Sequence, residues 1–378
     1  MTARPKLLFV VTEDWYFVSH RLPLAAAAQA AGFEVAVATR DGGHAEAIRA
    51  VGIRLVPFHL SRAYGNPLRE IQALVRLYRR ERPAIVHHVA LKPIVYGAIA
   101  ARIAGVPAQV NAVVGLGWLF TSPKGVMRLI PPAARWILAT LLRTRGTMTI
   151  VQNPDDRALL MRSHLPESRI RLIRGAGVDT TVFAPAPEPP GPVCIVLAAR
   201  MLWDKGVGEF VEAARLIRHT GVWARFVLVG DPDPDNPASI SESTLRGWHG
   251  HEGVEWWGRR DDMPSVFHAA HIACLPSYRE GLPKVLLEAA ACGRPVVTTD
   301  APGCREVVRD GDNGILEPPR DPQSLADALA KLIKDERLRR AMGKHGRELV
   351  LKEFSSEQVV RETIGVYREL RASLAAPS

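Results

Sequence analysis

The sequence predicts an α/β protein built from two doubly wound, Rossmann-like domains with a helical C-terminus. Short, fully apolar runs rich in β-branched residues alternate with helical patterns, which indicates parallel sheets covered on both faces. The chain has 378 residues, too many for one hydrophobic core and suitable for two domains. A Pro-rich stretch at 184–192 divides the alternation into two halves. Such a stretch cannot join a sheet and acts as a stiff connector.

The first half, residues 1–184, holds six predicted strands with helical patterns between them. The strands are expected near 6–11, 33–39, 53–58, 84–88, 108–113 and 148–151, and the helices at 25–31, 46–50 and 68–82. The first apolar run ends at Thr12, which makes it too short for the core of a secretory signal and suits a strand. These elements predict the first Rossmann-like domain.

The second half, residues 193–355, shows the same alternation and continues into helices. Strands are expected near 193–199, 225–230, 254–257, 271–275 and 295–299, and helices at 209–219, 283–292, 324–334, 336–344 and 356–374. The last helix is expected to pack back on the first domain. Two such domains leave a cleft between them. Ligands of open α/β sheets bind beyond the carboxyl ends of strands, so functional motifs are expected there.

The charge is unevenly distributed between the halves. Residues 1–185 hold 24 Lys and Arg against 11 Asp and Glu, a net charge of +13, whereas residues 186–378 hold 25 against 28, a net charge of −3. A basic half suggests an anionic partner, which could be nucleic acid, a phosphorylated substrate or an acidic membrane surface. The four cysteines form no CxxC pair, so we expect reduced thiols in the cytoplasm and no zinc finger. No apolar stretch reaches 18 residues, so no membrane-spanning segment is predicted.

The densest group of polar residues follows the predicted strand at 271–275. A loop carries Glu280 and Gly281, Pro283 suits the first position of the next helix, and Gly293 suits its end. Helix N-termini stabilise phosphate groups. The main-chain amides expected at this one belong to Gly281, Leu282, Lys284 and Val285.

Two further groups of residues could complete an anion site. Glu288 lies about one and a half turns into the same helix, where its carboxylate could accept hydrogen bonds from a diol. Arg200 and Lys205 follow the strand at 193–199 and can both reach one anion. Each charge-assisted hydrogen bond to a diphosphate contributes ~1.5–3 kcal/mol. The spacing alone is also compatible with purely structural roles for these residues. Glu280 could pair with a local arginine, Glu288 could be a surface residue, and 200–205 could be a solvated loop.

Arg200 and Lys205, together with Glu280 and Glu288, resemble the retaining nucleotide-sugar glycosyltransferases of the GT-B fold, family 4, the group 1 glycosyltransferases. The resemblance covers nearly the whole chain, because further segments fall in the expected order at 175–183, 229–231, 257–258, 302–306 and 312–314. It implies that Arg200 and Lys205 hold the donor diphosphate and stabilise its departure. It further implies that Glu280 contacts the donor sugar, Glu288 the ribose and Arg259 the base. Family members retain the anomeric configuration and need no metal or other cofactor.

An acidic motif points in another direction. Asp231, Asp233 and Asp235 form the pattern Asp-x-Asp twice, by which metal-dependent glycosyltransferases of another fold hold manganese. A single-domain enzyme of that kind would not carry the other motifs. We therefore interpret the segment as a proline-stiffened acidic loop and expect no metal site.

Three segments of the first half, each after a predicted strand, resemble a subgroup of the family that extends undecaprenyl-diphosphate-linked saccharides, N-acetylgalactosaminyltransferases among them. The residues that this resemblance implies for acceptor binding are Trp15, His20, Arg21, Lys92, Gly115 and Gly117. The implied reaction moves a hexose or N-acetylhexosamine from a UDP-sugar to a lipid diphosphate-linked saccharide. It would serve the assembly of bacterial surface polysaccharide or glycan.

The chain departs from the family pattern at two places. Glu13 and Asp14 stand in the first strand-helix loop, where many members have a Gly-Gly pair. Val89 stands at the second histidine of a His-x-His pattern, which leaves His87 and His88 as catalytic candidates. A buried histidine is more often a structural group, so these two carry less weight than the residues of the second half.

The segment Lys124–Arg145 predicts a basic amphipathic helix. Its apolar residues at 134, 137, 138, 141 and 142 share one face, and arginines lie to one side. Such a helix suits an anionic membrane surface, so we expect the protein to bind peripherally to the inner face of the cytoplasmic membrane. The alternative is that this apolar face packs on its own sheet.

Two other functions are compatible with part of the sequence. A UDP-N-acetylglucosamine 2-epimerase has the same fold, but it needs neither a lipid acceptor nor a basic docking face. The spacing of Glu280 and Glu288 and the predicted basic helix therefore argue against it. Nucleic-acid binding is disfavoured because no aromatic stacking platform accompanies the basic residues and no known binding module is present.

Overall fold

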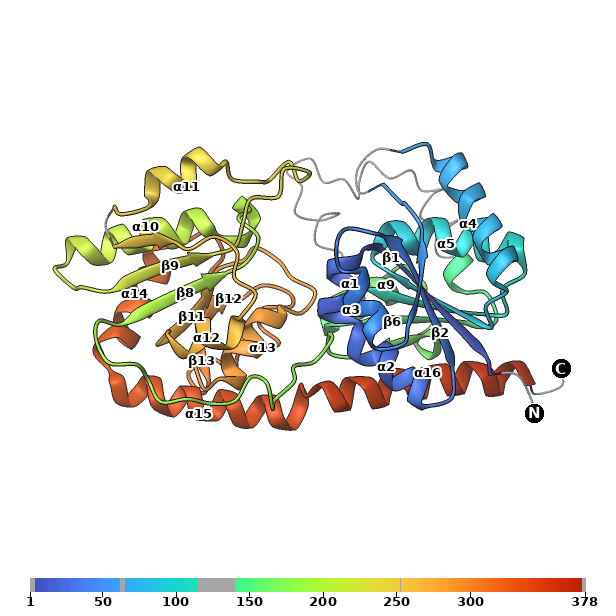
Figure 1. Cartoon of the computed structure of the whole chain (residues 1–378). Coiled ribbons are helices and arrows are strands. Elements are labelled where there is room, and N and C mark those ends of the chain that lie inside the picture. The colour runs from blue at the N-terminus through green and yellow to red at the C-terminus, as the bar shows by residue number, and fades with distance from the viewer. Residues whose placement is uncertain (1–3, 62–64, 115–139, 252, 376–378) are drawn as a thin grey trace. The chain divides into compact units, whose positions relative to one another are not determined.

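The computed structural model describes residues 4–61, 65–114, 140–251 and 253–375, and these residues form two compact units (Figure 1). The first unit comprises Met1–Ala176 and Glu357–Ser378, and the second comprises Gly177–Ser356. Gly115, Gly117 and most of the predicted basic helix at 124–145 lie outside the described residues. Among the helices that are described, none is both long and apolar enough to cross a bilayer.

The first unit contains a parallel sheet in the order β3-β2-β1-β4-β5-β6-β7 within its described residues. The strands are β1 (Lys6–Glu13), β2 (Glu34–Arg40), β3 (Arg54–Pro57), β4 (Ile85–Val89), β5 (Ala108–Val113), β6 (Thr147–Val151) and β7 (Ile170–Leu172). The six predicted strands are confirmed. Strand β7 was not predicted, because it has three residues and a charged one, Arg171, in the middle.

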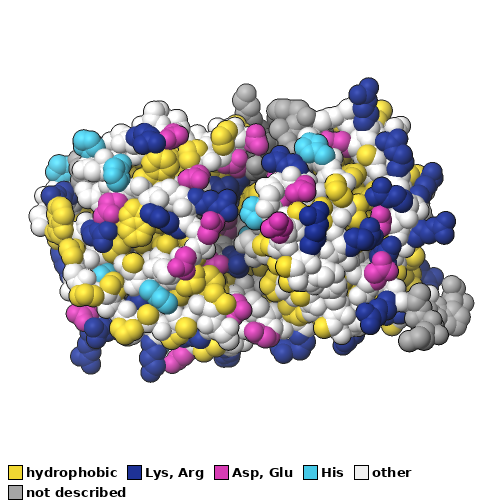
Figure 2. Space-filling model, in the orientation of Figure 1, with side chains coloured by type: hydrophobic (Ala, Val, Ile, Leu, Met, Phe, Trp, Pro, Cys, Tyr) yellow, Lys and Arg dark blue, Asp and Glu magenta, His cyan; other side chains and the backbone are white. Residues whose placement is uncertain are grey.

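Helices cover both faces of this sheet. They are α1 (Asp14–His20), α2 (Leu22–Ala30), α3 (Ala45–Ala50), α4 (Pro67–Glu81), α5 (Leu91–Ala104), α9 (Pro154–Arg162) and α16 (Ser356–Ala375), with a 3-10 turn η1 at Glu167–Arg169. Helices α4 and α5 pack on one face, and α4 carries exposed arginines at 69, 76, 79 and 80. Figure 2 shows Lys and Arg side chains gathered on the side of the first unit where Figure 1 places α4.

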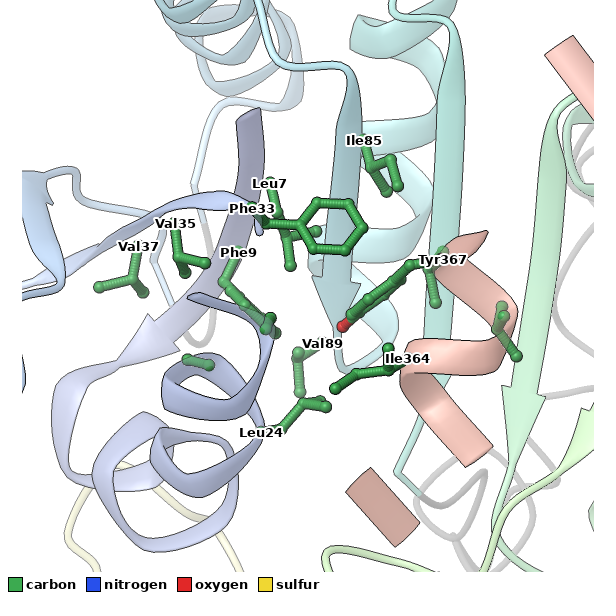
Figure 3. Close-up of a cluster of buried hydrophobic side chains, with 14 of the residues drawn as sticks. Leu7, Phe9, Leu24, Phe33, Val35, Val37, Ile85, Val89, Ile364 and Tyr367 are labelled. Atoms are coloured by element: carbon green, nitrogen blue, oxygen red, sulfur yellow. The ribbon is translucent and has the colours of Figure 1, made fainter. Parts of the chain in front are cut away.

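The opposite face of the first sheet is covered by α1, α2 and the C-terminal helix α16. Figure 3 shows Leu7 and Phe9 of β1 beside Leu24 of α2 and Ile364 and Tyr367 of α16, all in one buried cluster. Tyr367 has no exposed surface. The last helix of the chain therefore supplies part of the core of the first unit.

The second unit contains a parallel sheet in the order β10-β9-β8-β11-β12-β13 within the residues described there. The strands are β8 (Cys194–Ala198), β9 (Arg225–Val229), β10 (Val254–Trp256), β11 (Ile272–Leu275), β12 (Val296–Thr299) and β13 (Gly314–Glu317). The other elements are η2 (Trp203–Lys205), α10 (Val207–His219), α11 (Glu242–Trp248), α12 (Met263–His268), α13 (Lys284–Ala291), α14 (Pro322–Lys334) and α15 (Glu336–Glu353). The predicted fold class, two Rossmann-like halves with a helical C-terminus, is confirmed.

The Pro-rich stretch is part of the second unit, and the division between the units falls earlier, at Gly177. Arg294 is almost fully buried, and it donates to the carbonyl oxygen of Pro187 (3.1 Å). Arg339 makes a two-pronged ion pair with Glu188 (3.1 and 3.0 Å). Arg347 donates to main-chain carbonyls at 180 and 183 (2.9 and 2.8 Å). These guanidinium groups, of which those of Arg294 and Arg339 are buried, hold residues 180–188 against the rest of the second unit.

Candidate active site

The candidate residues of the second unit lie in loops at one edge of its sheet. Strands β8, β9, β11 and β12 run parallel, so their carboxyl ends meet at the same edge. The loops that leave this edge span 199–206, 230–241, 276–283 and 300–313. This is the edge at which open α/β sheets bind ligands.

Lys205 and Glu280 form an ion pair at this edge. The Lys205 Nζ atom lies 2.5 Å from Glu280 Oε1, and the two side chains are 18% and 13% exposed. The sequence left open that Glu280 pairs with a local arginine. Its partner is instead a lysine from a loop 75 residues away. A partly buried pair of this kind is held in a lower dielectric than a surface pair, which strengthens the interaction.

The loops that carry this pair are fixed to each other by hydrogen bonds. The amide of Tyr278 and the hydroxyl of Ser277 both donate to the carbonyl oxygen of Asp204 (3.0 and 3.1 Å). The Tyr278 hydroxyl donates to Glu209 Oε1 in α10 (2.5 Å). Gly206 permits this close approach, because it has a φ of +73° and a Cβ there would lie 2.1 Å from a main-chain oxygen of Pro276.

A third loop closes against the main chain of Glu280. The amide of Glu280 donates to the carbonyl oxygen of Pro302 (2.9 Å). Gly303 has a φ of +83°, and a Cβ at this position would lie 2.4 Å from the carbonyl oxygen of Glu280. The segment 302–306, which the family resemblance singled out, therefore supports the loop that carries Glu280.

Helix α13 begins at Lys284, one residue later than the sequence predicted. Pro283 has a ψ of 100°, which is extended, so it is the cap and not the first helical residue. Gly293 follows the helix with a φ of +75°, as expected for its end. Lys284 Nζ lies 3.0 Å from Glu288 Oε1, one turn along the helix. Burial raises the pKa of Glu288, and the positive charge of Lys284 lowers it. The effect of burial is the larger, so the pKa of Glu288 lies above its usual value.

The acidic loop after β9 is bound by protein groups. Asp233 Oδ2 lies 2.5 Å from Arg200 Nη1. Asp231 Oδ1 accepts a hydrogen bond from the amide of Arg259 (3.0 Å), whose side chain is exposed and pairs with Asp261. Nowhere in the described part of the chain do three His, Cys, Asp or Glu side chains gather as a metal ion would need.

The cations of the candidate site thus share one arrangement. Each of Arg200, Lys205 and Lys284 is paired with a carboxylate, from Asp233, Glu280 and Glu288 respectively. The three pairs bring no net charge to the edge of the sheet. An anion bound here is therefore recognised by directed hydrogen-bond donors more than by an excess of positive charge.

In the first unit, His88 is a core residue. It has no exposed surface, its Nδ1 lies 2.8 Å from Asn111 Oδ1 and its Nε2 lies 2.9 Å from the hydroxyl of Tyr78. The Asn111 oxygen can only accept, so Nδ1 carries the proton and Nε2 accepts from Tyr78. Burial lowers the pKa of His88 to about 4. With both ring nitrogens used, the catalytic role considered for His88 does not fit its position.

His87 is also buried, but only one of its ring nitrogens is occupied. Nδ1 lies 2.6 Å from the hydroxyl of Tyr367, and the ring stacks on Phe9 with 5.0 Å between centroids. Burial, the charge of Arg21 and the neighbouring His88 lower the pKa of His87 well below its usual value. Nε2 has no hydrogen-bond partner among the described residues.

Strand β1 passes directly into α1, so the expected loop at Glu13 and Asp14 is absent: Glu13 ends the strand and Asp14, which stands where the family often has glycine, begins the helix. Its carboxylate accepts from the amides of Trp15, Gly42 and His44 (2.7, 2.7 and 2.8 Å). Burial acts to raise the pKa of Asp14, but these amide donors outweigh it and the pKa is lowered. The side chain thus ties α1 to the loop after β2.

Three predicted acceptor residues lie on α1 or just after it. Trp15 is half-buried, His20 stacks on Tyr16 with 4.2 Å between centroids, and Arg21 is 5% exposed. In the described residues no carboxylate pairs with Arg21. A buried cation without a carboxylate partner is suited to binding an anionic ligand.

Lys92, another predicted acceptor residue, is directed toward protein groups. Its Nζ lies 2.8 Å from the carbonyl oxygen of Ser61, 2.5 Å from the Ser61 hydroxyl and 2.8 Å from Glu70 Oε2. An ammonium group has three donors. Lys92 therefore ties the loop after β3 to α4 and α5, and this arrangement leaves no N–H group for an acceptor.

The two parallel α/β units and the paired cations at the edge of the second sheet define a GT-B glycosyltransferase. Two family models match the chain, one described as "Glycosyl transferase 4-like" over residues 6–150 and one as "Glycosyl transferases group 1" over residues 192–335. The chain belongs to the group 1 glycosyltransferases, as the sequence resemblance suggested, and it is a glycosyltransferase.

Curated relatives align with most of the chain. It is 26% identical over 347 residues to the N,N'-diacetylbacillosaminyl-diphospho-undecaprenol alpha-1,3-N-acetylgalactosaminyltransferase of Campylobacter jejuni, covering 86% of this chain and 88% of that protein. It is 25% identical over 328 residues to the UDP-Gal:alpha-D-GlcNAc-diphosphoundecaprenol alpha-1,3-galactosyltransferase of Escherichia coli, covering 80% of each.

Solved structures share the fold. A sucrose-phosphate synthase from Thermosynechococcus elongatus superimposes with a TM-score of 0.80 at 21% identity, covering 98% of this chain and 100% of that one. Anabaena Alr3699/HepE in complex with UDP and glucose superimposes with a TM-score of 0.77 at 18% identity, covering 96% and 99%. These likenesses place the chain in the GT-B fold.

Proposed function

We propose that this glycosyltransferase transfers a hexose or N-acetylhexosamine from a UDP-sugar to an undecaprenyl-diphosphate-linked saccharide, with retention of configuration. The observation that carries the proposal is the acceptor named for two relatives that align with at least 80% of this chain, both of them diphosphoundecaprenol-linked sugars. The names of both relatives also specify an alpha linkage. The product would serve the assembly of surface polysaccharide or glycan.

The donor end of the reaction is assigned to the edge of the second sheet. Arg200 and Lys205 bind the diphosphate of the UDP-sugar, with the first amides of α13 beside them. Glu280, held by Lys205 at 2.5 Å, accepts hydrogen bonds from the sugar hydroxyls. Glu288 is buried in α13, and its carboxylate accepts from the ribose hydroxyls. The main chain near Arg259 contacts the base.

The chemical step needs no base from the protein in this proposal. The acceptor hydroxyl oxygen forms a bond to the anomeric carbon while the bond from that carbon to the UDP oxygen breaks. The acceptor proton passes to the departing phosphate on the same face of the sugar, which retains the configuration. Lys205 and Arg200 stabilise the charge that develops on UDP, a contribution that is larger in the transition state than in the bound substrate. No metal ion takes part.

The acceptor is assigned to the first unit. Arg21 is the most suitable of the described residues for its diphosphate, because it is a buried cation with no carboxylate partner there. Trp15 and His20 offer ring faces to a saccharide. The net charge of +13 over residues 1–185 favours attachment of this unit to the anionic inner face of the cytoplasmic membrane, where the lipid-linked acceptor is embedded.

A panel assay tests the proposal. The purified protein is incubated with UDP-glucose, UDP-galactose and their N-acetylated counterparts, each with a synthetic undecaprenyl-diphosphate-linked monosaccharide, and products are read by mass spectrometry. We expect extension of the lipid-linked sugar by one residue with one donor, and an alpha anomer by NMR. Extension of free sugars but of no lipid-linked one, or release of a free sugar as an epimerase would give, contradicts the assignment.

A further inference from the structure

The loop after β9, residues 230–241, carries Asp233 and has no role in the proposed function. Main-chain hydrogen bonds fix it against the segment that follows β8, as in the bond from Trp203 N to the carbonyl oxygen of Ala238 (2.9 Å). Within the loop, the amide of Asp233 donates to the hydroxyl of Ser239 (2.9 Å). The loop therefore presents Asp233 to Arg200 from a fixed position.

The contact between Asp233 and Arg200 is asymmetric in burial. The Asp233 side chain is 9% exposed and its Oδ2 lies 2.5 Å from Arg200 Nη1, whereas the Arg200 side chain is 43% exposed. A buried carboxylate needs a charged or hydrogen-bonding partner, and Arg200 supplies one. No second hydrogen-bond acceptor engages the Arg200 guanidinium among the residues that the structure describes.

We propose that Asp233 is a positioning residue for the donor: it holds one edge of the Arg200 guanidinium so that the other edge faces the donor diphosphate. This inference rests on the proposed function, because it takes Arg200 as a diphosphate ligand. A guanidinium is planar with its donors in a rigid fork, so fixing one edge orients the rest. Orienting the side chain before the donor arrives lowers the entropy lost on binding.

The neighbouring carboxylate acts in the same way on the main chain. Asp231 accepts from the amide of Arg259 (3.0 Å) and thereby fixes the turn that follows β10. The Asp-x-Asp pattern thus organises an arginine and a peptide group at the donor edge. In this assignment the two carboxylates bind protein groups, whereas in metal-dependent glycosyltransferases of the other fold the same pattern binds a metal ion.

The opposite role for Asp233 would be that of a competitor. Its negative charge would then occupy Arg200 until the diphosphate displaced it. The two roles predict opposite effects when the carboxylate is removed. Positioning predicts weaker binding of UDP, and competition predicts tighter binding.

A double-mutant cycle measured with UDP separates these roles. Asp233→Asn, Asp233→Ala, Arg200→Ala and the double variant Arg200→Ala with Asp233→Ala are titrated with UDP by calorimetry, after thermal unfolding has confirmed that each is folded. We expect the dissociation constant to rise about tenfold in both Asp233 variants, the scale of one charge-assisted hydrogen bond. We expect the double variant to bind no more weakly than Arg200→Ala alone, because Asp233 acts only through Arg200.

A matched control is Asp235→Asn, which removes a carboxylate from the same loop and is expected to leave UDP affinity unchanged. Tighter binding in the Asp233 variants, or additive losses in the double variant, would overturn the inference. Unchanged UDP affinity in Arg200→Ala would instead remove Arg200 from the proposed donor site. This variant therefore tests the proposed donor site independently of the role of Asp233. Manganese that restores UDP binding to Asp233→Asn would also contradict a positioning role.

Discussion

The ammonium group of Lys205 lies 2.5 Å from the carboxylate of Glu280 and joins two loops that are far apart in the sequence. We expect Lys205→Met and Glu280→Gln each to lower kcat/KM by about 10²–10³-fold, the effect of removing one preorganised charge-stabilising group. Steady-state kinetics with the preferred UDP-sugar measure the loss. Both variants should remain folded, which thermal unfolding checks, and near-normal turnover in either would remove the pair from the active site.

The Tyr278 hydroxyl, bonded to Glu209, is expected to support the Glu280 loop. Burial and the adjacent Glu209 carboxylate raise the pKa of Tyr278 to about 12, so the hydroxyl stays protonated and donates. Tyr278→Phe should lower stability by about 1 kcal/mol and reduce both kcat/KM and the affinity for UDP severalfold. Tyr367→Phe is the matched control, because it removes a tyrosine hydroxyl that is buried in the first unit and should leave the affinity for UDP unchanged. Equal effects of the two variants on UDP affinity would contradict a local role for Tyr278.

His88 predicts a loss of stability in mild acid. Its pKa is about 4 in the folded protein against a reference of 6.5, so the unfolded chain binds more protons between these values. The free energy of unfolding should therefore be highest above pH 6.5 and fall as the pH drops toward 4, by about 3 kcal/mol for this group. Urea denaturation of the wild type and of His88→Gln from pH 7.5 to 4.5 measures it. The variant should show a shallower decline, and parallel curves would refute the assignment.

Chelation should leave glycosyl transfer intact. Asp231 and Asp233 are engaged by the amide of Arg259 and by Arg200, so we expect the same rate before and after dialysis against EDTA. Product formation is followed by mass spectrometry, with a manganese-dependent glycosyltransferase as the positive control for chelation. Activity that disappears with EDTA and returns with manganese would establish a metal role for the acidic loop.

Attachment of the protein to membranes should depend on salt. The first half carries a net charge of +13, so flotation with vesicles rich in anionic lipid should recover the protein at low ionic strength and lose it at high ionic strength. Neutral vesicles are the control. Binding of UDP to the charge-balanced candidate site of the second unit should vary much less with salt, which calorimetry can test in the same buffers. Failure to float at low salt would argue against electrostatic attachment.

Most of the fold could be predicted because most strands contain a short, buried run of apolar residues. The elements that were missed have patterns that periodicity does not detect. Helix α1 is rich in aromatic residues that favour strands. Helix α5 is apolar nearly all round, with small buried residues on several sides. Strand β13 begins with Gly314 and has only two apolar residues.

The candidate site could be predicted only as separate residues. Lys205 and Glu280 were each singled out, but their pairing depends on the order of β8 and β11 in the sheet. Tyr278 was not singled out, because nothing in the sequence marks a tyrosine whose hydroxyl reaches Glu209. The burial of His88 between Tyr78 and Asn111 likewise depends on contacts between α4, β4 and β5.

The contribution of α16 to the first unit has a consequence for synthesis. Phe33 and His87 contact Tyr367, which is translated after the whole of the second unit. The N-terminal unit therefore cannot complete its core while the ribosome is still making the second unit, although domains usually fold in the order of their synthesis. The nascent first half must wait with an open apolar face, and the second unit can be finished first. A chain truncated before residue 356 would lack α16 and would leave the core of the first unit incomplete.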